Sequence, residues 1–130
     1  MTGAPSFGTL VAILPCNDLD ASERFYGRLG FVRRVESGDP DYRILSNSMS
    51  GHLHLTRAEK GWLVPGRNPG GLYLYLEDVD ALAAALQDLR PGSRAPEDKP
   101  WGMYEFAISD PDETLVRIGW PSRLRRRAEG

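Results

Sequence analysis

The sequence predicts an α+β fold built from two copies of a βαβββ module. Three observations lead to this prediction: an internal repeat, a strand followed by a helix at each copy, and short alternating apolar runs after each helix. The motif NDLDA at residues 17–21 recurs in related form as EDVDA at residues 77–81, sixty positions later. Such a unit is too long for a solenoid repeat, and two copies are too few for an array. Duplication of one module is the simpler interpretation.

The first module is expected to begin with a strand at residues 9–14, where apolar side chains alternate. Asp18 or Asp20 would cap the helix that follows, with Glu23 as the capping-box partner of Asp20. The helix is predicted to bury one stripe of side chains, Ser22, Phe25, Tyr26 and Leu29. Three further strands are expected at residues 31–36, 42–46 and 51–57.

The second module repeats this order, with a strand at 72–76 and a helix stopped by Pro91 and Gly92. Its buried stripe would be Val79, Leu82, Leu86 and Leu89. Strands are expected at 103–109 and 114–120, and a weakly indicated one at 93–96. The domain assignment is a single domain, 1–130, with module one at about 7–57, a linker at about 58–70, module two at about 71–121 and a basic tail at 122–130.

Composition narrows the class of protein. The chain is 41% hydrophobic and 26% charged, which is ordinary for a soluble globular domain. It lacks an apolar run of the roughly 18 residues that a membrane span needs, and residues 1–7 lack a secretory pattern, so a cytoplasmic protein is expected. A single cysteine, Cys16, excludes an internal disulfide and a multi-thiolate metal site, and is expected to be a small buried or half-buried thiol.

Charge is unevenly distributed. The net charge is −2, yet residues 123–130 hold four arginines and one glutamate. The remaining body is mildly acidic, which argues against a nucleic-acid-binding surface. We expect the basic tail to be solvated and frayed. Arg33, Arg34 and Arg43 are expected on solvated strand faces.

Two segments carry a resemblance to a known family. They are LPCNDLDAS at residues 14–22, followed by Phe25-Tyr26 and a Leu-Gly-Phe, and PWGMYEFA at residues 100–107, followed by Asp-Pro-Asp. Together they resemble the vicinal-oxygen-chelate superfamily of glyoxalase I, extradiol dioxygenases, fosfomycin-resistance enzymes and bleomycin-resistance proteins. The resemblance runs from Thr9 to about Pro121, and the second segment points to the bleomycin-resistance branch. It implies two modules forming a curved mixed sheet with a concave cleft and helices on the outside.

Metal-using members of that superfamily bind a divalent ion with four side chains on facing strands. By spacing from the Asp-x-Asp turns, the equivalent positions fall near Val11, His54, Gly71 and Arg117. Of these, only His54 can ligate, whereas a catalytic metal needs about three protein ligands. We therefore expect neither a metal nor another cofactor. One alternative stays open, in which His52 and His54, on one strand face, hold an ion with Glu105.

A cleft without a metal binds by shape and stacking on apolar and aromatic walls with a few polar anchors. The resemblance implies capture of a large, planar-ended antibiotic in a crevice between two subunits, without chemistry. The acidic body would suit a cationic drug. The predicted ligand-binding residues are the aromatic Trp62, Tyr73, Tyr75, Trp101 and Tyr104 and the polar anchors His54, Glu105 and Arg117. For Trp101, packing in a dimer is an equal alternative.

The leading hypothesis is a homodimeric, metal-independent protein that binds an aromatic small molecule, such as a planar peptide or glycopeptide antibiotic, and gives drug sequestration or self-resistance. No catalytic residue is assigned, because neither a nucleophilic triad nor a phosphate-binding loop is evident. The first alternative is a metal-dependent lyase, isomerase or dioxygenase that uses His52 or His54. The second is a domain that binds a metabolite or an effector.

Overall fold

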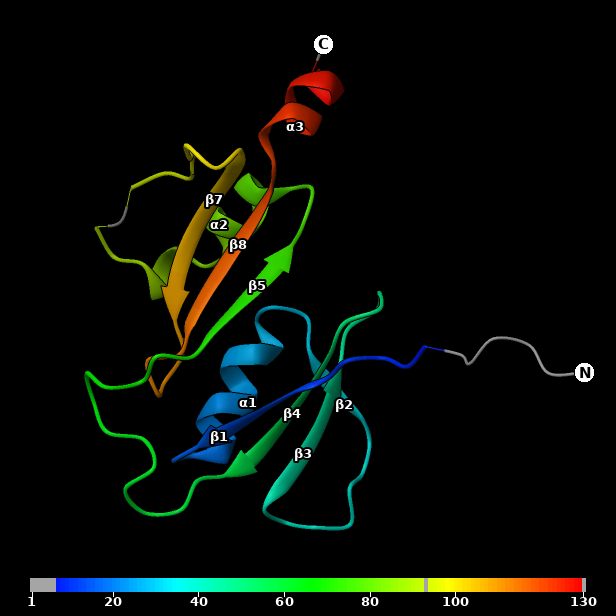
Figure 1. The fold of residues 1–130 in the computed structure, drawn as a ribbon, viewed down its shortest axis with the longest axis vertical. Helices are drawn as coiled ribbons and strands as arrows, with labels where there is room; N and C mark the ends of the chain where they lie inside the picture. Colours follow the sequence, from blue (N-terminus) through cyan, green and yellow to red (C-terminus); the bar gives the residue numbers. More distant parts are fainter. Residues whose placement is uncertain (1–6, 93, 130) are drawn as a thin grey trace, which may run out of the picture. The chain divides into compact units, whose positions relative to one another are not determined.

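The computed structural model describes residues 7–92 and 94–129. The chain divides into two compact units, Met1–Leu63 and Val64–Gly130, and the boundary lies inside the predicted linker. Each unit contains one βαβββ module and its own four-stranded mixed sheet (Figure 1). The predicted α+β fold with two modules is confirmed. The concave cleft and the assignment to a single domain stay predictions.

Module one has strand order β1-β4-β3-β2, with β1 and β4 parallel and the other pairs antiparallel. Its elements are β1 (Ala12–Cys16), α1 (Leu19–Gly27), β2 (Val32–Val35), β3 (Tyr42–Ser46) and β4 (His52–Arg57). The first strand begins at Ala12 and not at residue 9 as predicted. The reason is that β1 pairs only with β4, and the first paired residues are Ala12 and Leu53. Residues 7–11, which precede it, lie outside the sheet (Figure 1), and Phe7 and Leu10 are almost fully exposed.

The core of module one lies between α1 and one face of the sheet. Phe25 and Tyr26 of α1 are 8% and 1% exposed, and their rings meet edge to face at 4.9 Å. Leu45 and Leu55 from the sheet are fully buried, as is Cys16 at the end of β1. The predicted helix stripe and the buried thiol are therefore confirmed. Each such large apolar side chain contributes about 2 kcal/mol of burial energy.

The two helices begin in the same way, which makes the duplication visible in atomic detail. Asp18 caps α1 by accepting a hydrogen bond from the backbone N–H of Ala21 at 3.1 Å. Asp78 caps the second helix by accepting from Ala81 N–H at the same distance. The predicted capping box from Asp20 to Glu23 is wrong, since the side-chain cap of α1 is Asp18, which accepts from the N–H of Ala21.

Removing either cap is expected to destabilise its module by about 1 kcal/mol, because the helix loses a side-chain acceptor for one orphan N–H. The test is chemical denaturation of Asp18→Ala and Asp78→Ala. Asp18→Asn is the control, since an amide oxygen still accepts the bond from Ala21. Equal losses in Asp18→Ala and Asp18→Asn would show that the capping bond is not the cause.

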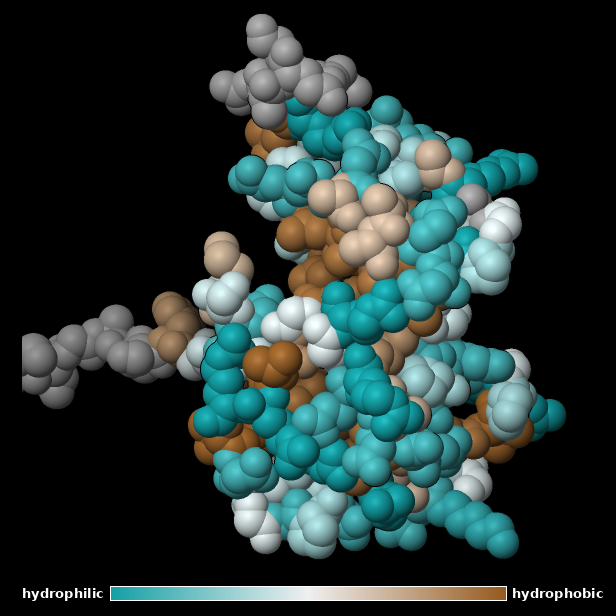
Figure 2. Space-filling model, turned by 180° about the vertical axis from the view of Figure 1, so that it is seen from behind, coloured by the Kyte–Doolittle hydropathy of each residue, from teal (hydrophilic) through white to brown (hydrophobic). Residues whose placement is uncertain are grey.

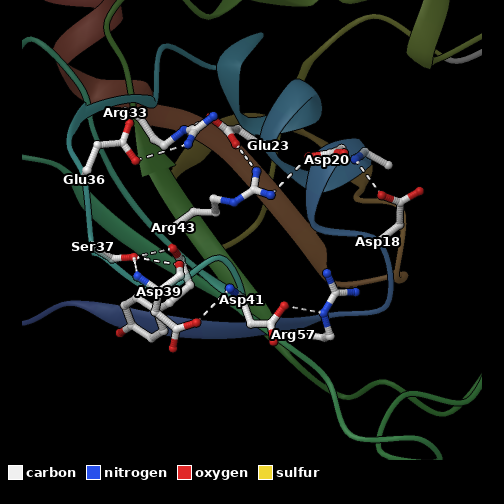
Figure 3. Close-up of polar contacts among 12 residues, drawn as sticks. Asp18, Asp20, Glu23, Arg33, Glu36, Ser37, Asp39, Asp41, Arg43 and Arg57 are labelled. Carbon is white, nitrogen blue, oxygen red and sulfur yellow. Dashed lines mark hydrogen bonds and ion pairs between the residues drawn. The ribbon is translucent and has the colours of Figure 1, made fainter.

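Glu23 belongs instead to a charged network on module one (Figure 3). Its two oxygens pair with Arg33 of β2, at 2.7 Å from Nε, and with Arg43 of β3. Arg43 also donates to Asp20 at 3.1 Å and its side chain is only 15% exposed. Hydrogen bonds to Glu23, opposed by burial and assisted by Asp20, raise the pKa of Arg43. The prediction that Arg33, Arg34 and Arg43 lie on solvated faces is wrong for Arg43, because its guanidinium bridges the sheet and α1.

Module two has strand order β5-β8-β7-β6, with β5 and β8 parallel and the others antiparallel. Its elements are β5 (Gly71–Tyr75), α2 (Val79–Ala85), a short 3₁₀ helix η1 (Gln87–Leu89), β6 (Glu97–Asp98), β7 (Met103–Ser109), β8 (Leu115–Pro121) and α3 (Ser122–Glu129). Val79 and Leu86 are buried as predicted, but Leu89 is 38% exposed, because the tighter turn of η1 rotates it off the stripe. The weak strand predicted at 93–96 is replaced by β6, and residue 93 lies outside the described residues.

The expectation of a frayed tail is wrong for its first turn. Ser122 is 4% exposed and donates to Asp98, and Arg125 lies with its guanidinium carbon 3.4 Å from the centre of the Tyr104 ring. Arg125 also approaches Asp80 of α2 at 3.5 Å. Cation–π contact and charge pairing thus join the start of α3 to module two. None of the helices in the described residues is long and apolar enough to cross a membrane.

The second part of the predicted linker is bound to module two. Asn68 donates from its amide nitrogen to the backbone oxygen of Asp112 at 3.0 Å and to the hydroxyl of Thr114 at 2.9 Å. The backbone N–H of Gly66 donates to Glu113 in the same turn. These contacts anchor residues 66–70 to the turn between β7 and β8, so that β5 starts from a fixed point.

Candidate functional site

One face of the sheet of module two is covered by α2, and the other is partly open to solvent. Phe106, Ile108, Val116 and Ile118 point to the covered side and are no more than 5% exposed. Period-two alternation places Tyr73 and Tyr75 of β5, Glu105 of β7 and Arg117 of β8 on the opposite side. We call this side the open face. Most of the surface in Figure 2 is hydrophilic, with hydrophobic residues in separate patches.

Glu105 lies at the centre of the open face and is only 3% exposed. One carboxylate oxygen, Oε1, accepts two hydrogen bonds. One comes from the Tyr73 hydroxyl at 2.8 Å and the other from the Trp101 indole N–H at 3.0 Å. The second oxygen lies 3.9 Å from Nη1 of Arg117. A buried carboxylate needs such donors and a nearby cation, because burial removes its hydration. Four predicted site residues are therefore brought together around one charge.

A glycine on β8 makes this arrangement possible. Tyr73 reaches Glu105 by crossing directly over Gly119, where a Cβ atom would lie 2.3 Å from the Tyr73 hydroxyl oxygen. The same Cβ would lie 2.7 Å from Cβ of Glu105 and 2.9 Å from the backbone oxygen of Tyr104. Burial, together with the hydrogen bond to Glu105, raises the pKa of Tyr73 well above the ordinary value, so its hydroxyl stays protonated as a donor.

The rings of the open face are held in place but remain accessible. Tyr75 is 62% exposed and packs against Tyr73, with ring centres 4.8 Å apart and planes tilted by 38°. Trp101 is 57% exposed and precedes Gly102, whose φ of 88° turns the chain into β7. The guanidinium carbon of Arg117 lies 5.8 Å from the centre of the Trp101 ring. Exposed rings fixed by hydrogen bonds and packing are suited to stacking with a planar ligand.

Beside Trp101 the open face has a hollow of about 170 Å³. It is lined by Lys99, Trp101, Glu105, Phe106, Ala107, Leu115 and Arg117. Lys99 pairs with Glu97 at 2.6 Å, so its charge is largely balanced. The hollow thus combines apolar side chains, the Trp101 indole and the positively charged Arg117 in one lining.

Tyr104 does not join this group. It points to the side of the sheet that carries α2 and donates to Asp80 at 2.5 Å, with Arg125 packed on its ring. Adjacent strand residues face opposite sides, so Tyr104 and Glu105 cannot share a face without a bulge. Burial and the Asp80 carboxylate raise the pKa of Tyr104 to about 12. Its predicted role in ligand binding has no support from this placement.

The raised pKa of Tyr104 predicts a loss of stability at alkaline pH. The folded state holds this proton more tightly than the unfolded chain, whose tyrosine pKa is near 10. The stabilisation is therefore complete below pH 10 and is lost as the pH rises towards 12. Denaturation across this range should show a shallower decline for Tyr104→Phe than for the natural chain. Identical declines would contradict the assignment to Tyr104.

The other predicted site residues belong to module one. The Nδ1 atom of His54 lies 2.6 Å from the Tyr42 hydroxyl, and the two rings meet edge to face at 5.3 Å. His52 is exposed two residues earlier on β4, on the same side of the strand as predicted. Trp62 is 62% exposed in a turn where its backbone N–H donates to Glu59. Their roles in ligand binding stay predictions.

The side chains at the metal positions of the fold family do not fit a divalent ion. Val11 and Gly71 have no donor atom, Arg117 is a cation beside Glu105, and one nitrogen of His54 is engaged by Tyr42. No three His, Cys, Asp or Glu side chains converge as a metal site within the described part of the chain. A metal-free site stays a prediction, and elemental analysis of the purified protein would test it.

Sequence reasoning missed Gly119 and the residues that line the hollow, Lys99, Ala107 and Leu115. One signal was available: Arg117 and Gly119 alternate with the apolar Val116 and Ile118 along β8, which marks the face away from the helix. The proximity of Gly119 to Tyr73 depends on the parallel pairing of β5 with β8, which periodicity does not reveal.

The comparisons with known proteins agree with this fold. A bleomycin-binding protein complexed with bleomycin is 26% identical, with a TM-score of 0.72 over 88% of this chain and 98% of that one. TnmS3, an antibiotic-binding protein from Streptomyces sp. CB03234, is 25% identical, with a TM-score of 0.69 over 92% and 100%. Lactoylglutathione lyase from Agrobacterium tumefaciens shares the fold at 20% identity, with a TM-score of 0.62 over 89% and 95%.

No curated protein sequence matches the chain. The family model for the glyoxalase/bleomycin resistance protein/dioxygenase superfamily matches residues 8–118, which include both modules as far as Ile118 of β8. The repeat, the two βαβββ modules and this match lead to one conclusion: the chain belongs to the glyoxalase/bleomycin resistance protein/dioxygenase superfamily.

Proposed function

We propose that this protein binds a planar, aromatic, antibiotic-like molecule, such as a peptide or glycopeptide antibiotic, and protects the cell by sequestering it without chemical change. The observation that carries the proposal is the open face of module two, where exposed rings surround a buried carboxylate. Trp101 and Tyr75 are 57% and 62% exposed although both are held in position by neighbouring groups. Surface aromatic groups fixed in this way are typical of ligand sites.

The similar structures support this class of ligand. Two of them are described as binding bleomycin or an antibiotic, at 26% and 25% identity. In our proposal Trp101 and Tyr75 stack on the ligand, Arg117 contacts its polar groups, and Tyr73 and Glu105 hold Trp101 in place. His54 and Trp62 are proposed as additional contacts from module one. We propose no catalytic residue, no metal and no other cofactor.

A homodimer in the cytoplasm is part of the proposal. The sheet of module one supports the dimer, because its side away from α1 carries a row of four side chains of which three are apolar. Register places Ile13, His54, Ile44 and Val35 side by side across β1, β4, β3 and β2. Ile13 and Val35 are 56% and 61% exposed, and exposed apolar rows of this kind are often covered by a partner. Light scattering at several concentrations would measure the oligomeric state.

The binding proposal is tested with metal-free bleomycin by quenching of tryptophan fluorescence, followed by mass spectrometry of the recovered ligand. Trp101→Leu should weaken binding about tenfold, because stacking and burial of one large ring contribute about 1.4 kcal/mol. Phe7→Leu is the matched control, since Phe7 is a 99% exposed aromatic residue outside the site. Equal loss in both variants would contradict the assigned site.

The same experiment separates the alternatives. Recovery of unchanged antibiotic, together with protection of cells that express the protein, would support sequestration. An ion retained after purification without chelator, with a turnover that chelator abolishes, would support a metal-dependent enzyme instead. Absence of binding to bleomycin and to related glycopeptides would overturn the antibiotic proposal and favour a metabolite ligand.

A further inference from the structure

The hollow on the open face presents a cation with unused hydrogen-bond donors. The Arg117 side chain is 45% exposed, and its contact with Glu105 is 3.9 Å, which is beyond hydrogen-bond length. The opposite oxygen of Glu105 already accepts two bonds, from Tyr73 and Trp101. Its contacts in the described part of the chain are this ion pair and the Trp101 ring, whose centre lies 5.8 Å from the guanidinium carbon. A guanidinium has five N–H donors, so Arg117 can bind a further acceptor.

A planar group has a place beside this cation. Trp101 lines the same hollow, and the guanidinium carbon of Arg117 lies 5.8 Å from the centre of its ring. The remaining lining is apolar at Ala107 and Leu115, and Lys99 adds a second positive charge that Glu97 balances. A ligand ring against Trp101 would therefore bring its substituent to Arg117.

We propose that the site selects planar aromatic ligands that carry an anionic group, such as a carboxylate or sulfonate, with the ring on Trp101 and the anion on Arg117. This inference rests on the proposed function and deepens it by naming the chemical class of the ligand. The net charge of the chain is −2, which favours a cationic ligand at long range. At contact distance the exposed charge of the hollow has the opposite sign, because Glu105 is buried and Arg117 is not.

The selectivity follows from the strength of charge-assisted bonds. A carboxylate or sulfonate accepts two parallel N–H bonds from a guanidinium, and such bonds are about twice as strong as neutral ones. A neutral ring of the same shape gains the stacking on Trp101 but not these bonds. The site should therefore distinguish two ligands that differ only in the anionic group.

Two fluorescent probes with the same rings test this directly: anilinonaphthalene sulfonate, which is anionic, and N-phenylnaphthylamine, which is neutral. The natural chain should bind the sulfonate at least about tenfold more tightly than the neutral probe. Arg117→Gln should remove this preference, because it weakens binding of the sulfonate about tenfold more than binding of the neutral probe. Arg117→Lys should keep part of it, since the charge remains but the planar pair of donors is lost. Arg123→Gln, an exposed position on α3, is the control with the same change of charge.

Salt dependence gives a second readout that needs no variant, because an exposed ion pair weakens with added salt while stacking does not. Equal affinity of the natural chain for both probes, or a preference that survives in a folded Arg117→Gln chain, would overturn the anion selectivity. If bleomycin binds but the preference is absent, only this inference fails. If bleomycin and related glycopeptides fail to bind but the sulfonate preference and its loss in Arg117→Gln are observed, the antibiotic proposal fails and the anion selectivity stands.

Discussion

Gly119→Ala is expected to destabilise module two by about 3 kcal/mol, the upper end of the usual cost of overpacking a well-packed position. The added methyl group would lie 2.3 Å from the Tyr73 hydroxyl oxygen, 2.7 Å from Cβ of Glu105 and 2.9 Å from the backbone oxygen of Tyr104. Rotation of Tyr73 relieves only the first contact. The other two involve the Cβ of Glu105, whose position is fixed by the backbone, and a backbone oxygen of β7, a strand that is paired with β8 on both sides of this position.

Chemical denaturation of Gly119→Ala measures this cost, and Gly27→Ala is the matched control. Gly27 ends α1, and a methyl group added there would have no atom within 4 Å, so alanine should be neutral or stabilise by up to about 1 kcal/mol. The double variant Gly119→Ala with Tyr73→Phe should lose about 1 kcal/mol less than the sum of the two single losses, because the closest contact disappears. A Gly119→Ala chain as stable as the natural one would show that Tyr73 does not cross over this glycine.

Glu105→Ala is the second large effect, with an expected loss of about 2–3 kcal/mol and a loosened Trp101. The substitution leaves the Tyr73 hydroxyl and the Trp101 indole N–H without their acceptor. Both hydrogen bonds are partly buried, so each unsatisfied donor should cost about 1 kcal/mol, the lower end of the range for buried groups. It also leaves Arg117 without its neighbouring carboxylate. We expect weaker bleomycin binding, because the indole is no longer held in a stacking position.

Glu105→Gln separates the hydrogen bonds from the charge. The amide oxygen can accept from both Tyr73 and Trp101, so this variant should lie within about 1 kcal/mol of the natural chain. Glu97→Ala on the adjacent strand is the control, because Glu97 forms an exposed pair with Lys99 and its loss should matter much less. Denaturation and the fluorescence anisotropy of tryptophan are the measurements. Equal losses in Glu105→Ala and Glu105→Gln would show that charge, not hydrogen bonding, organises the site.

The sequence by itself determined the duplicated plan of the chain and the residue types of the site. The two Asp-capped helix starts, the alternating strands and the buried stripe of α1 are local patterns, and local patterns depend on residues a few positions apart. The predicted roles of Glu105 and Arg117 as polar anchors came from residue chemistry and family resemblance. Leu89 was predicted to be buried on the helix stripe of module two. That prediction failed because the chain changes from the α-helix α2 to the 3₁₀ helix η1 before this residue.

Only the tertiary structure decided which side chains meet. Tyr73 and Glu105 are separated by thirty-two residues, and their contact depends on β8 lying between β5 and β7 with a glycine at the crossing point. The same pairing turned Tyr104 away from the open face, although it is adjacent to Glu105 in the chain. Strand order and register arise from packing over the whole module, so no pattern within one segment encodes them.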